Sequence, residues 1–143
     1  DVLNENADGV FILCGMRDIM LDEPMSSIEE NIQVTLDKAQ EAGLKVIVLG
    51  KPPLTTLKSA EAGWQVPSEV DKHNEALKTY RAWLDEEAAR RNLPVLDFQE
   101  VLTKAAAESG KELLLDGLHP NAEGYKAVAA AFVKLMEESR ALA

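Results

Sequence analysis

The sequence predicts a single α/β domain in which a parallel sheet lies between two layers of helices. Short apolar runs typical of buried strands alternate with longer segments whose apolar residues recur at helical spacing. The 143 residues suit one domain, and no repeat, low-complexity tract or linker divides them. These observations predict a three-layer α/β/α sandwich over residues 1–143.

Three segments are predicted as strands, namely residues 10–14, 45–49 and 93–98. Each is a short apolar run, as expected of a strand that helices cover on both faces. Helical crossovers would make the strands parallel, so their C-terminal ends would meet at one edge of the sheet. Functional groups collect at that edge in such folds.

Four helices are predicted. Ser27 and Glu30 form a capping-box pattern that starts the first helix, and Gly43 follows its end. Ser68 and Asp71 form a second capping pattern, starting a helix that extends to about residue 91. Its inward face is expected to hold Val70, Leu77, Tyr80, Leu84 and Ala88. Residues 55–67 lack periodicity and are expected to form a loop at the edge of a site.

The last two helices are predicted at about residues 98–109, stopping near Gly110, and from an Asn121 N-cap to about residue 140. The final helix carries an apolar stripe at helical spacing: Ala122, Tyr125, Val128, Ala129, Phe132, Leu135 and Met136.

Composition excludes several classes of function. The net charge of −10 and pI of about 4.6 argue against nucleic acid and anionic membrane surfaces as partners. No apolar run approaches the ~18 residues of a membrane span, and no signal peptide is visible. A soluble protein is therefore expected, either cytoplasmic or secreted. Cys14 is the only cysteine and is expected to be an inert core residue.

No cofactor or metal is expected from the sequence. It contains no phosphate-binding or dinucleotide-binding glycine motif, and no His, Cys, Asp and Glu cluster has metal-ligand spacing. His73 follows an expected helix start and is predicted to face solvent or to cap the helix.

The most informative stretch is Asp116-Gly117-Leu118-His119-Pro120. A carboxylate three residues before a histidine can accept a hydrogen bond from its Nδ1 across a tight loop. This bond fixes the tautomer and stabilises the imidazolium when Nε2 takes a proton. Local hydrogen bonding at a helix start is the alternative interpretation.

This stretch and its continuation, DGLHPNAEGYKAVA, closely resemble the last conserved block of the SGNH hydrolases, the GDSL-type esterases and lipases. The resemblance implies a flavodoxin-like α/β/α fold and a Ser-His-Asp triad without a cofactor. His119 would be the general base and Asp116 the acid that orients it. The implied activity is hydrolysis of small or medium acyl esters.

Other segments resemble the family in the expected order. Residues 10–18 resemble its third block, residues 46–49 with Pro52–Leu54 the next strand and its proline-rich exit, and residues 95–97 the strand before the final helices. By this resemblance Gly15 and Arg17 would flank the oxyanion. The weaker candidates for the substrate pocket are Asp18, Pro53, Leu54 and Trp64. Trp64 packed on the fold is an equal alternative.

Two departures from the family bear on activity. The opening G-D-S block and the second block with its oxyanion glycine are absent, so the resemblance implies a nucleophilic serine and two first strands outside this chain. The exposed edge strand Val10–Cys14 is then expected to be covered by an N-terminal segment, a second chain or a homodimer partner. The chain alone is expected to be inactive.

The second departure is Arg17, which stands where the family has an asparagine. Its guanidinium could donate to an oxyanion, bind an anionic group of the substrate, or lie in a surface turn. The absent nucleophile and Arg17 also leave open a non-catalytic binding or structural domain on the same scaffold. A receiver-like domain has the same alternation of elements but does not explain the D-x-x-H-P stretch.

Overall fold

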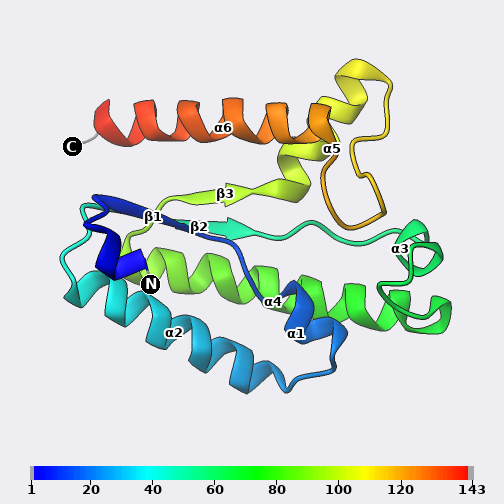
Figure 1. Ribbon diagram of the computed structural model, residues 1–143, viewed down its shortest axis with the longest axis horizontal. Coiled ribbons are helices and arrows are strands. Elements are labelled where there is room, and N and C mark those ends of the chain that lie inside the picture. The colour runs from blue at the N-terminus through cyan, green and yellow to red at the C-terminus, as the bar shows by residue number, and fades with distance from the viewer. Residues whose placement is uncertain (1, 142–143) are drawn as a thin grey trace.

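The computed structural model describes residues 2–141 and shows helices on both faces of a parallel three-stranded sheet (Figure 1). The sheet has the order β1-β2-β3, with β1 at Gly9–Ile12, β2 at Val46–Lys51 and β3 at Val95–Asp97. Val10 pairs with Ile47, and Leu49 pairs with Val95. The three-layer α/β/α class predicted from the sequence is confirmed.

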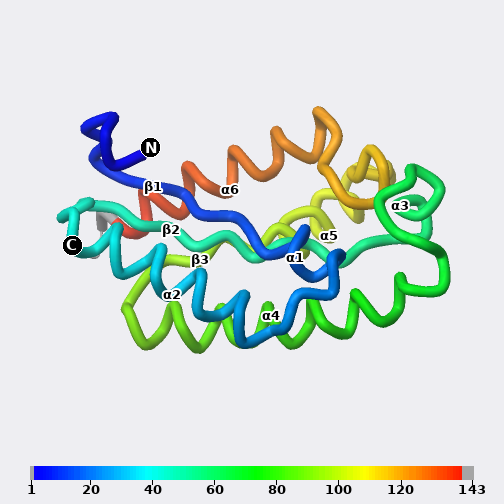
Figure 2. Tube along the Cα trace, turned by 60° about the horizontal axis from the view of Figure 1, so that its bottom comes forward, coloured from blue at the N-terminus to red at the C-terminus, as the bar shows by residue number. Residues whose placement is uncertain are grey.

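The helices divide between the two faces. The α-helices are α1 (Met16–Met20), α2 (Met25–Glu41), α3 (Lys58–Glu61), α4 (Val70–Arg91), α5 (Phe98–Ser109) and α6 (Ala122–Ala141). Short 3₁₀-helices occupy η1 (Val2–Glu5) and η2 (Pro67–Glu69). Figures 1 and 2 show α2 and α4 on one face and α6 on the other. None of these helices, within the described residues, is long and apolar enough to cross a bilayer.

Two apolar cores lie on opposite faces of the sheet because successive side chains of a strand point to opposite faces. On β2, Ile47 and Leu49 join the core beneath α2 and α4, and Val48 joins the core beneath α5 and α6. The predicted inward residues of α4 are all buried: Val70, Leu77, Tyr80, Leu84 and Ala88. The long helix and its packing face are therefore confirmed.

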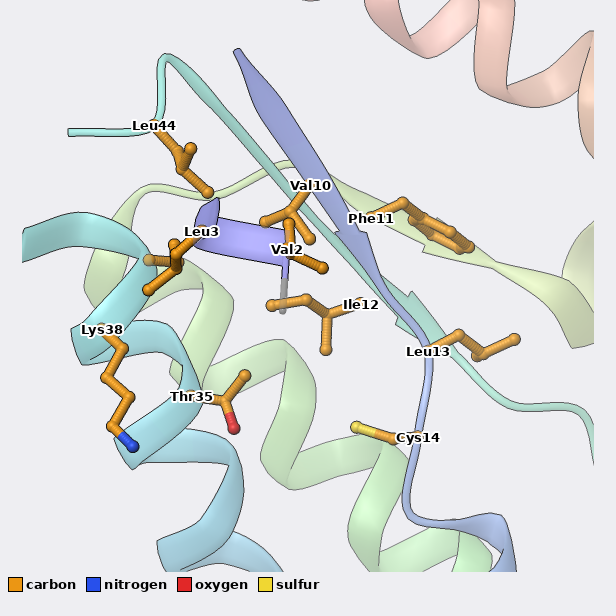
Figure 3. A pocket seen from close by; sticks show the side chains of 11 residues that line it. Val2, Leu3, Val10, Phe11, Ile12, Leu13, Cys14, Thr35, Lys38 and Leu44 are labelled. Carbon is orange, nitrogen blue, oxygen red and sulfur yellow. The ribbon is translucent and has the colours of Figure 1, made fainter. Parts of the chain in front are cut away.

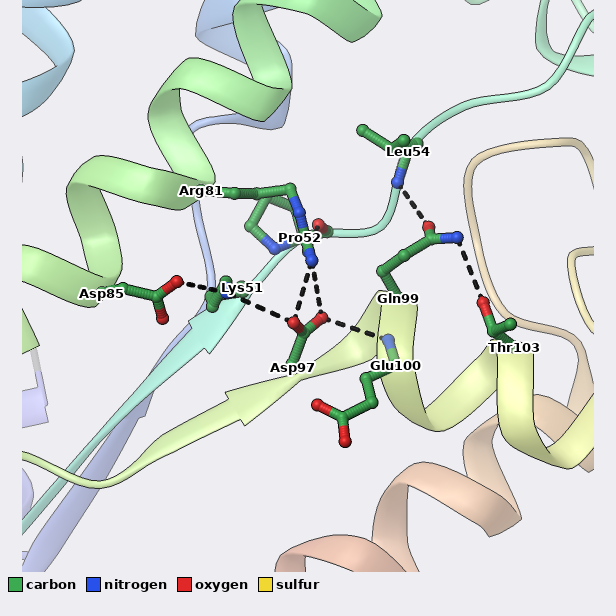
Figure 4. Close-up of polar contacts among 9 residues, drawn as sticks. All are labelled: Lys51, Pro52, Leu54, Arg81, Asp85, Asp97, Gln99, Glu100 and Thr103. Atoms are coloured by element: carbon green, nitrogen blue, oxygen red, sulfur yellow. Dashed lines mark hydrogen bonds and ion pairs between the residues drawn. The ribbon is translucent and has the colours of Figure 1, made fainter.

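A partly buried ionic network fixes the C-terminal end of β2 to α4 and β3. Asp97 accepts two hydrogen bonds from Arg81 Nη2, at 2.8 and 3.0 Å, and lies 3.2 Å from Lys51 Nζ (Figure 4). Arg81 Nη1 also donates to the carbonyl of Pro52. Burial favours a raised pKa for Asp97, but the Glu100 N–H, Arg81 and Lys51 outweigh it and lower the pKa.

Several local predictions were wrong. Helix α2 begins at Met25 after Pro24, and α4 follows η2, so neither Ser27 nor Ser68 is the N-cap residue. The predicted loop 55–67 contains α3 and the start of η2. By contrast, Gly43 has φ of 72° and follows the C-cap residue Ala42 of α2, which is the C′ position predicted for it.

The edge strand and the last helix also differ from prediction. Strand β1 ends at Ile12, so Cys14 lies beyond it and is exposed, and Phe11 is only partly covered. In α6 the predicted stripe holds for Val128, Phe132, Leu135 and Met136, which pack in the core. Ala122, Tyr125 and Ala129 are exposed instead, and Gly124 is buried against Leu113. The predicted Asn121 N-cap is confirmed by its side-chain bond to the Gly124 N–H at 2.9 Å.

Candidate active site

The Asp116–Pro120 loop is held rigidly beyond the C-terminal ends of the strands. Leu114 and Pro120 form an antiparallel bridge, and the Leu115 N–H donates to the His119 carbonyl at 2.7 Å. The carbonyl of Gly117 accepts a hydrogen bond from the Thr56 N–H. These backbone bonds fix the direction in which the His119 side chain leaves the loop.

Gly117 permits this loop because of both its conformation and its surroundings. Its φ is 75°, and a Cβ there would lie 2.5 Å from the Ser59 nitrogen and 2.6 Å from Thr56 Oγ1. We expect Gly117→Ala to lower the free energy of unfolding by about 2–4 kcal/mol, from left-handed strain plus a clash with backbone. Gly43→Ala is the matched control, since Gly43 has a similar φ of 72° but nothing within 4 Å of a Cβ.

Urea unfolding of the two alanine variants separates strain from crowding. An equal loss of stability in both variants would show that the contact of Gly117 with Ser59 and Thr56 contributes nothing.

Asp116 and His119 lie in direct contact, as the spacing predicted. His119 Nδ1 is 2.8 Å from Asp116 Oδ2, and because a carboxylate only accepts, Nδ1 is the donor. Asp116 Oδ1 accepts the backbone N–H groups of His119 and Leu118, at 2.7 and 3.0 Å. Nε2 of the half-exposed imidazole is therefore the nitrogen that can take up a proton when the ring is neutral.

Trp64 completes the environment of Asp116. Its indole Nε1 donates to Asp116 Oδ2 at 2.7 Å, and its ring meets the His119 ring edge to face with centroids 5.1 Å apart. Burial favours a raised pKa for Asp116. The His119 N–H and imidazole, then Trp64 and the Leu118 N–H, outweigh burial and lower this pKa to about 2. Asp116 is therefore a carboxylate at neutral pH.

We expect Trp64→Phe to raise the pKa of Asp116 from about 2 toward its ordinary 3.8, because one donor to Oδ2 is lost. The lowered pKa stabilises the fold fully above pH 3.8, and this contribution disappears as the pH falls toward 2. Carboxyl NMR titration measures the shift, with Trp83→Phe as the control because Trp83 stacks on Tyr80 instead. An unchanged Asp116 midpoint in Trp64→Phe would contradict the role of the indole.

A cavity of about 160 Å³ opens beside His119. It is lined by Leu13, Cys14, Met16, Pro52, Pro53, Phe98, Leu118, His119, Pro120 and Tyr125. The structure thus brings the ends of β1 and β2 together with the Asp116–His119 loop. Of the four weaker pocket candidates, Pro53 lines this cavity, whereas Trp64 contacts the Asp116–His119 pair from outside the lining.

The remaining sequence candidates lie around this cavity without lining it. Gly15 has φ of 97° and stands between the lining residues Cys14 and Met16. Arg17 is exposed on α1, and Asp18 follows it in the same helix. Leu54 uses its backbone N–H to donate to Gln99 Oε1 at 2.8 Å, which fixes the segment after β2 (Figure 4).

The sequence prediction for His73 was wrong, because its side chain is buried rather than solvent-facing. It lies beside Asp22 and Glu69, and one ligand atom from each residue lies within 4.8 Å of the others. Sequence spacing predicted no such cluster, because Asp22 is far from the other two residues along the chain. Burial of a polar side chain by residues distant in sequence leaves no local pattern that could have revealed it.

Comparison with solved structures shows the same fold in longer chains. A lipolytic protein of the G-D-S-L family from Veillonella parvula is 23% identical with a TM-score of 0.63, and covers 88% of this chain and 61% of its own. A GDSL-like lipase from Bacteroides thetaiotaomicron is 20% identical with a TM-score of 0.75, and the shares are 97% and 66%. An acetylxylan esterase from Geobacillus stearothermophilus is 19% identical with a TM-score of 0.71, and the shares are 94% and 62%.

This chain therefore spans less than two thirds of the length of those three proteins. No curated protein matches the chain. The model of the GDSL-like lipase/acylhydrolase family matches residues 1–127, which is most of the sequence. With the parallel sheet and its fold likeness to GDSL-type proteins, this match shows that the chain belongs to the GDSL-like lipase/acylhydrolase family.

Proposed function

We propose that residues 1–143 carry the general base and the orienting acid of a serine ester hydrolase that acts on small or medium acyl esters. The observation that carries this proposal is the Asp116–His119 pair beside a cavity at the C-terminal edge of the sheet. The family match and the acetylxylan esterase among the similar structures support the reaction class.

In this mechanism His119 Nε2 takes the proton of a serine hydroxyl as the serine oxygen attacks the acyl carbonyl. The imidazolium then returns that proton to the leaving alcohol, and an acyl-enzyme remains. Water repeats the sequence and releases the acid. Asp116 stays ionised throughout and stabilises the imidazolium, while Trp64 positions Asp116. Gly15 and Arg17 are proposed to flank the oxyanion.

The proposed nucleophile lies outside these 143 residues. The backbone of Ser59 packs against Gly117, but the Ser59 side chain is fully buried. Its Oγ donates to the Thr56 carbonyl at 2.6 Å and accepts from Gln65 Nε2 at 2.6 Å. Ser59 Oγ is thus occupied by hydrogen bonds within the fold. Among the hydrogen bonds of residues 2–141, none joins a serine hydroxyl to His119.

We also propose that a strand from outside these residues covers the free edge of β1. Figure 3 shows Val2, Val10 and Ile12 around a cavity of about 390 Å³ beside β1. Apolar side chains at an unpaired edge favour another strand as the occupant. A segment of the same polypeptide is the occupant we favour, because this chain spans only 61–66% of three proteins of the same fold.

Hydrolysis of p-nitrophenyl acetate tests the proposal with two proteins. The 143-residue chain alone is expected to give no turnover above background, and the natural translation product is expected to turn the ester over. Sedimentation of the same two samples tests whether the edge of β1 is covered, since only the 143-residue chain should self-associate through β1. Turnover by the short chain would place the nucleophile within it.

A non-catalytic binding or structural domain is the second candidate. It is favoured by Arg17 at the asparagine position and by the absence of a hydroxyl paired with His119 among the described residues. A natural translation product that folds normally but does not hydrolyse the ester would support this candidate and contradict the proposed hydrolase function.

A further inference from the structure

The buried His73 side chain belongs to a hydrogen-bond network that fixes its tautomer. Asn74 Oδ1 accepts the Thr55 N–H at 2.8 Å, and Asn74 Nδ2 donates to the Thr55 carbonyl at 2.8 Å. These two backbone bonds set the orientation of the Asn74 amide. Oδ1 therefore also accepts the Thr55 hydroxyl, at 3.0 Å, which uses the only proton of that hydroxyl.

The same reasoning orients Gln65. The Ser59 hydroxyl donates its only proton to the Thr56 carbonyl, and the Thr55 hydroxyl donates its only proton to Asn74. Both hydroxyl oxygens must therefore accept from Gln65. The Gln65 atom that contacts them, at 2.6 and 2.9 Å, is therefore the nitrogen Nε2. Its Oε1 then faces His73 Nδ1 at 2.6 Å, so Nδ1 carries a proton.

His73 Nε2 is consequently left with a lone pair in the neutral ring. This atom is buried, in a residue that is only 3% exposed, and it has no hydrogen-bond partner among the described residues. It points toward Asp22, whose Oδ1 lies 3.4 Å away. A lone pair facing a carboxylate is unfavourable unless a proton on Nε2 or a metal cation lies between them.

Glu69 supplies a second carboxylate at the same place. It lies four residues before His73, so both side chains share one face at the start of α4, and Asp22 approaches from the segment after α1. In the structure Lys72 Nζ bridges the two carboxylates and lies 2.8 Å from Asp22 and 2.6 Å from Glu69. The Lys72 side chain is 56% exposed and can leave without uncovering the core.

We propose that Asp22, Glu69 and His73 form a binding site for a zinc-type divalent cation, which displaces the Lys72 ammonium. Two ligand atoms about 2.0–2.1 Å from a tetrahedral Zn²⁺ lie roughly 3.3–3.4 Å apart, which matches the His73–Asp22 separation of 3.4 Å. One imidazole and two carboxylates suit zinc better than magnesium or calcium. The Nδ1–H bond to Gln65 is the support that metal-binding histidines usually have.

Such a cation would link the segment after α1 to the start of α4. It would act as a structural clamp rather than as a catalytic centre, since none of its three ligands lines the cavity beside His119. The proposal therefore stands whether or not the chain is part of a hydrolase.

Calorimetric titration of the chelator-treated 143-residue chain with ZnCl₂ tests the site. We expect one ion per chain, and about tenfold or greater weakening in Asp22→Asn and in Glu69→Gln. Both residues lie at the surface side of the cluster, so these variants test the site without emptying the core. MgCl₂ is expected to give no binding in the same concentration range.

Lys72→Ala gives the more discriminating result. Removing the competing ammonium is expected to tighten zinc binding several-fold, whereas a merely structural ion pair would give no zinc binding in any variant. Lys78→Ala is the matched control, because Lys78 pairs with Glu75 at 2.7 Å and is equally exposed. This control is expected to leave zinc affinity unchanged.

Two other residues could bind zinc adventitiously, namely Cys14 and His119. The Cys14→Ser, His119→Asn double variant is therefore expected to retain the full stoichiometry. The proposal is overturned if this double variant loses the ion, if Asp22→Asn and Glu69→Gln bind zinc as tightly as the unchanged chain, or if the unchanged chain binds none.

Discussion

Replacement of His119 by alanine in the natural translation product is expected to lower kcat/KM for an acyl ester by about 10³-fold or more. The physical reason is that a serine hydroxyl is a weak nucleophile at neutral pH without an adjacent base. In the proposed mechanism Nε2 of His119 is this base, because Nδ1 is held by Asp116 at 2.8 Å. Steady-state kinetics with p-nitrophenyl acetate measures the loss.

The Asp116→Asn variant distinguishes a catalytic pair from a structural one. An asparagine can still accept the backbone N–H groups of His119 and Leu118, so the loop should persist. It cannot compensate the charge of the imidazolium, and we expect kcat to fall by about 10³–10⁴ with little change in KM. A variant with normal kcat would show that Asp116 only shapes the loop.

Replacement of Asp97 by asparagine is expected to destabilise the fold by about 3 kcal/mol. Asparagine keeps the side-chain bond that caps α5 at Glu100 but removes the charge. Arg81, with a side chain only 14% exposed, then loses a counter-ion that is itself only 18% exposed. Urea unfolding with a linear extrapolation gives the change in free energy.

Asp85→Asn is the matched control for Asp97→Asn, because both carboxylates bind Lys51. Asp85 lies 2.7 Å from Lys51 Nζ, but its side chain is 55% exposed, so its loss should cost less than about 1 kcal/mol. Equal destabilisation by Asp97→Asn and Asp85→Asn would contradict the importance of burial.

Because the pKa of Asp97 is lowered in the folded state, the contribution of Asp97 to stability is present above its unfolded pKa of about 3.8 and is lost as the pH falls further.

The parts of the fold that sequence predicted well are those set by local periodicity. The inward face of α4, the bounds of α5 and the Asn121 cap all follow from residue spacing within one element. The Asp116–His119 contact could also be predicted, because three residues of a tight loop suffice to form it.

The predictions that failed depend on contacts between distant elements. The exception is the start of α2, where the reason is local: Ser27 and Glu30 match a capping box, yet Pro24 and Met25 begin the helix one turn earlier. His73 resembles a surface residue by position, but Gln65 and Asp22 enclose it. Trp64 likewise contacts Asp116, which lies 52 positions further along the chain, so no local pattern predicts this hydrogen bond.

The most direct test of the central claim is to locate the serine that reacts with a fluorophosphonate probe in the natural translation product. Peptide mass spectrometry identifies the labelled residue, and His119→Ala should abolish labelling. We predict a labelled serine outside the 143 residues, in a segment that pairs with β1. Labelling of Ser59 or another serine of this chain, or no labelling of a folded natural product, would contradict a base at His119 that serves a hydroxyl from elsewhere.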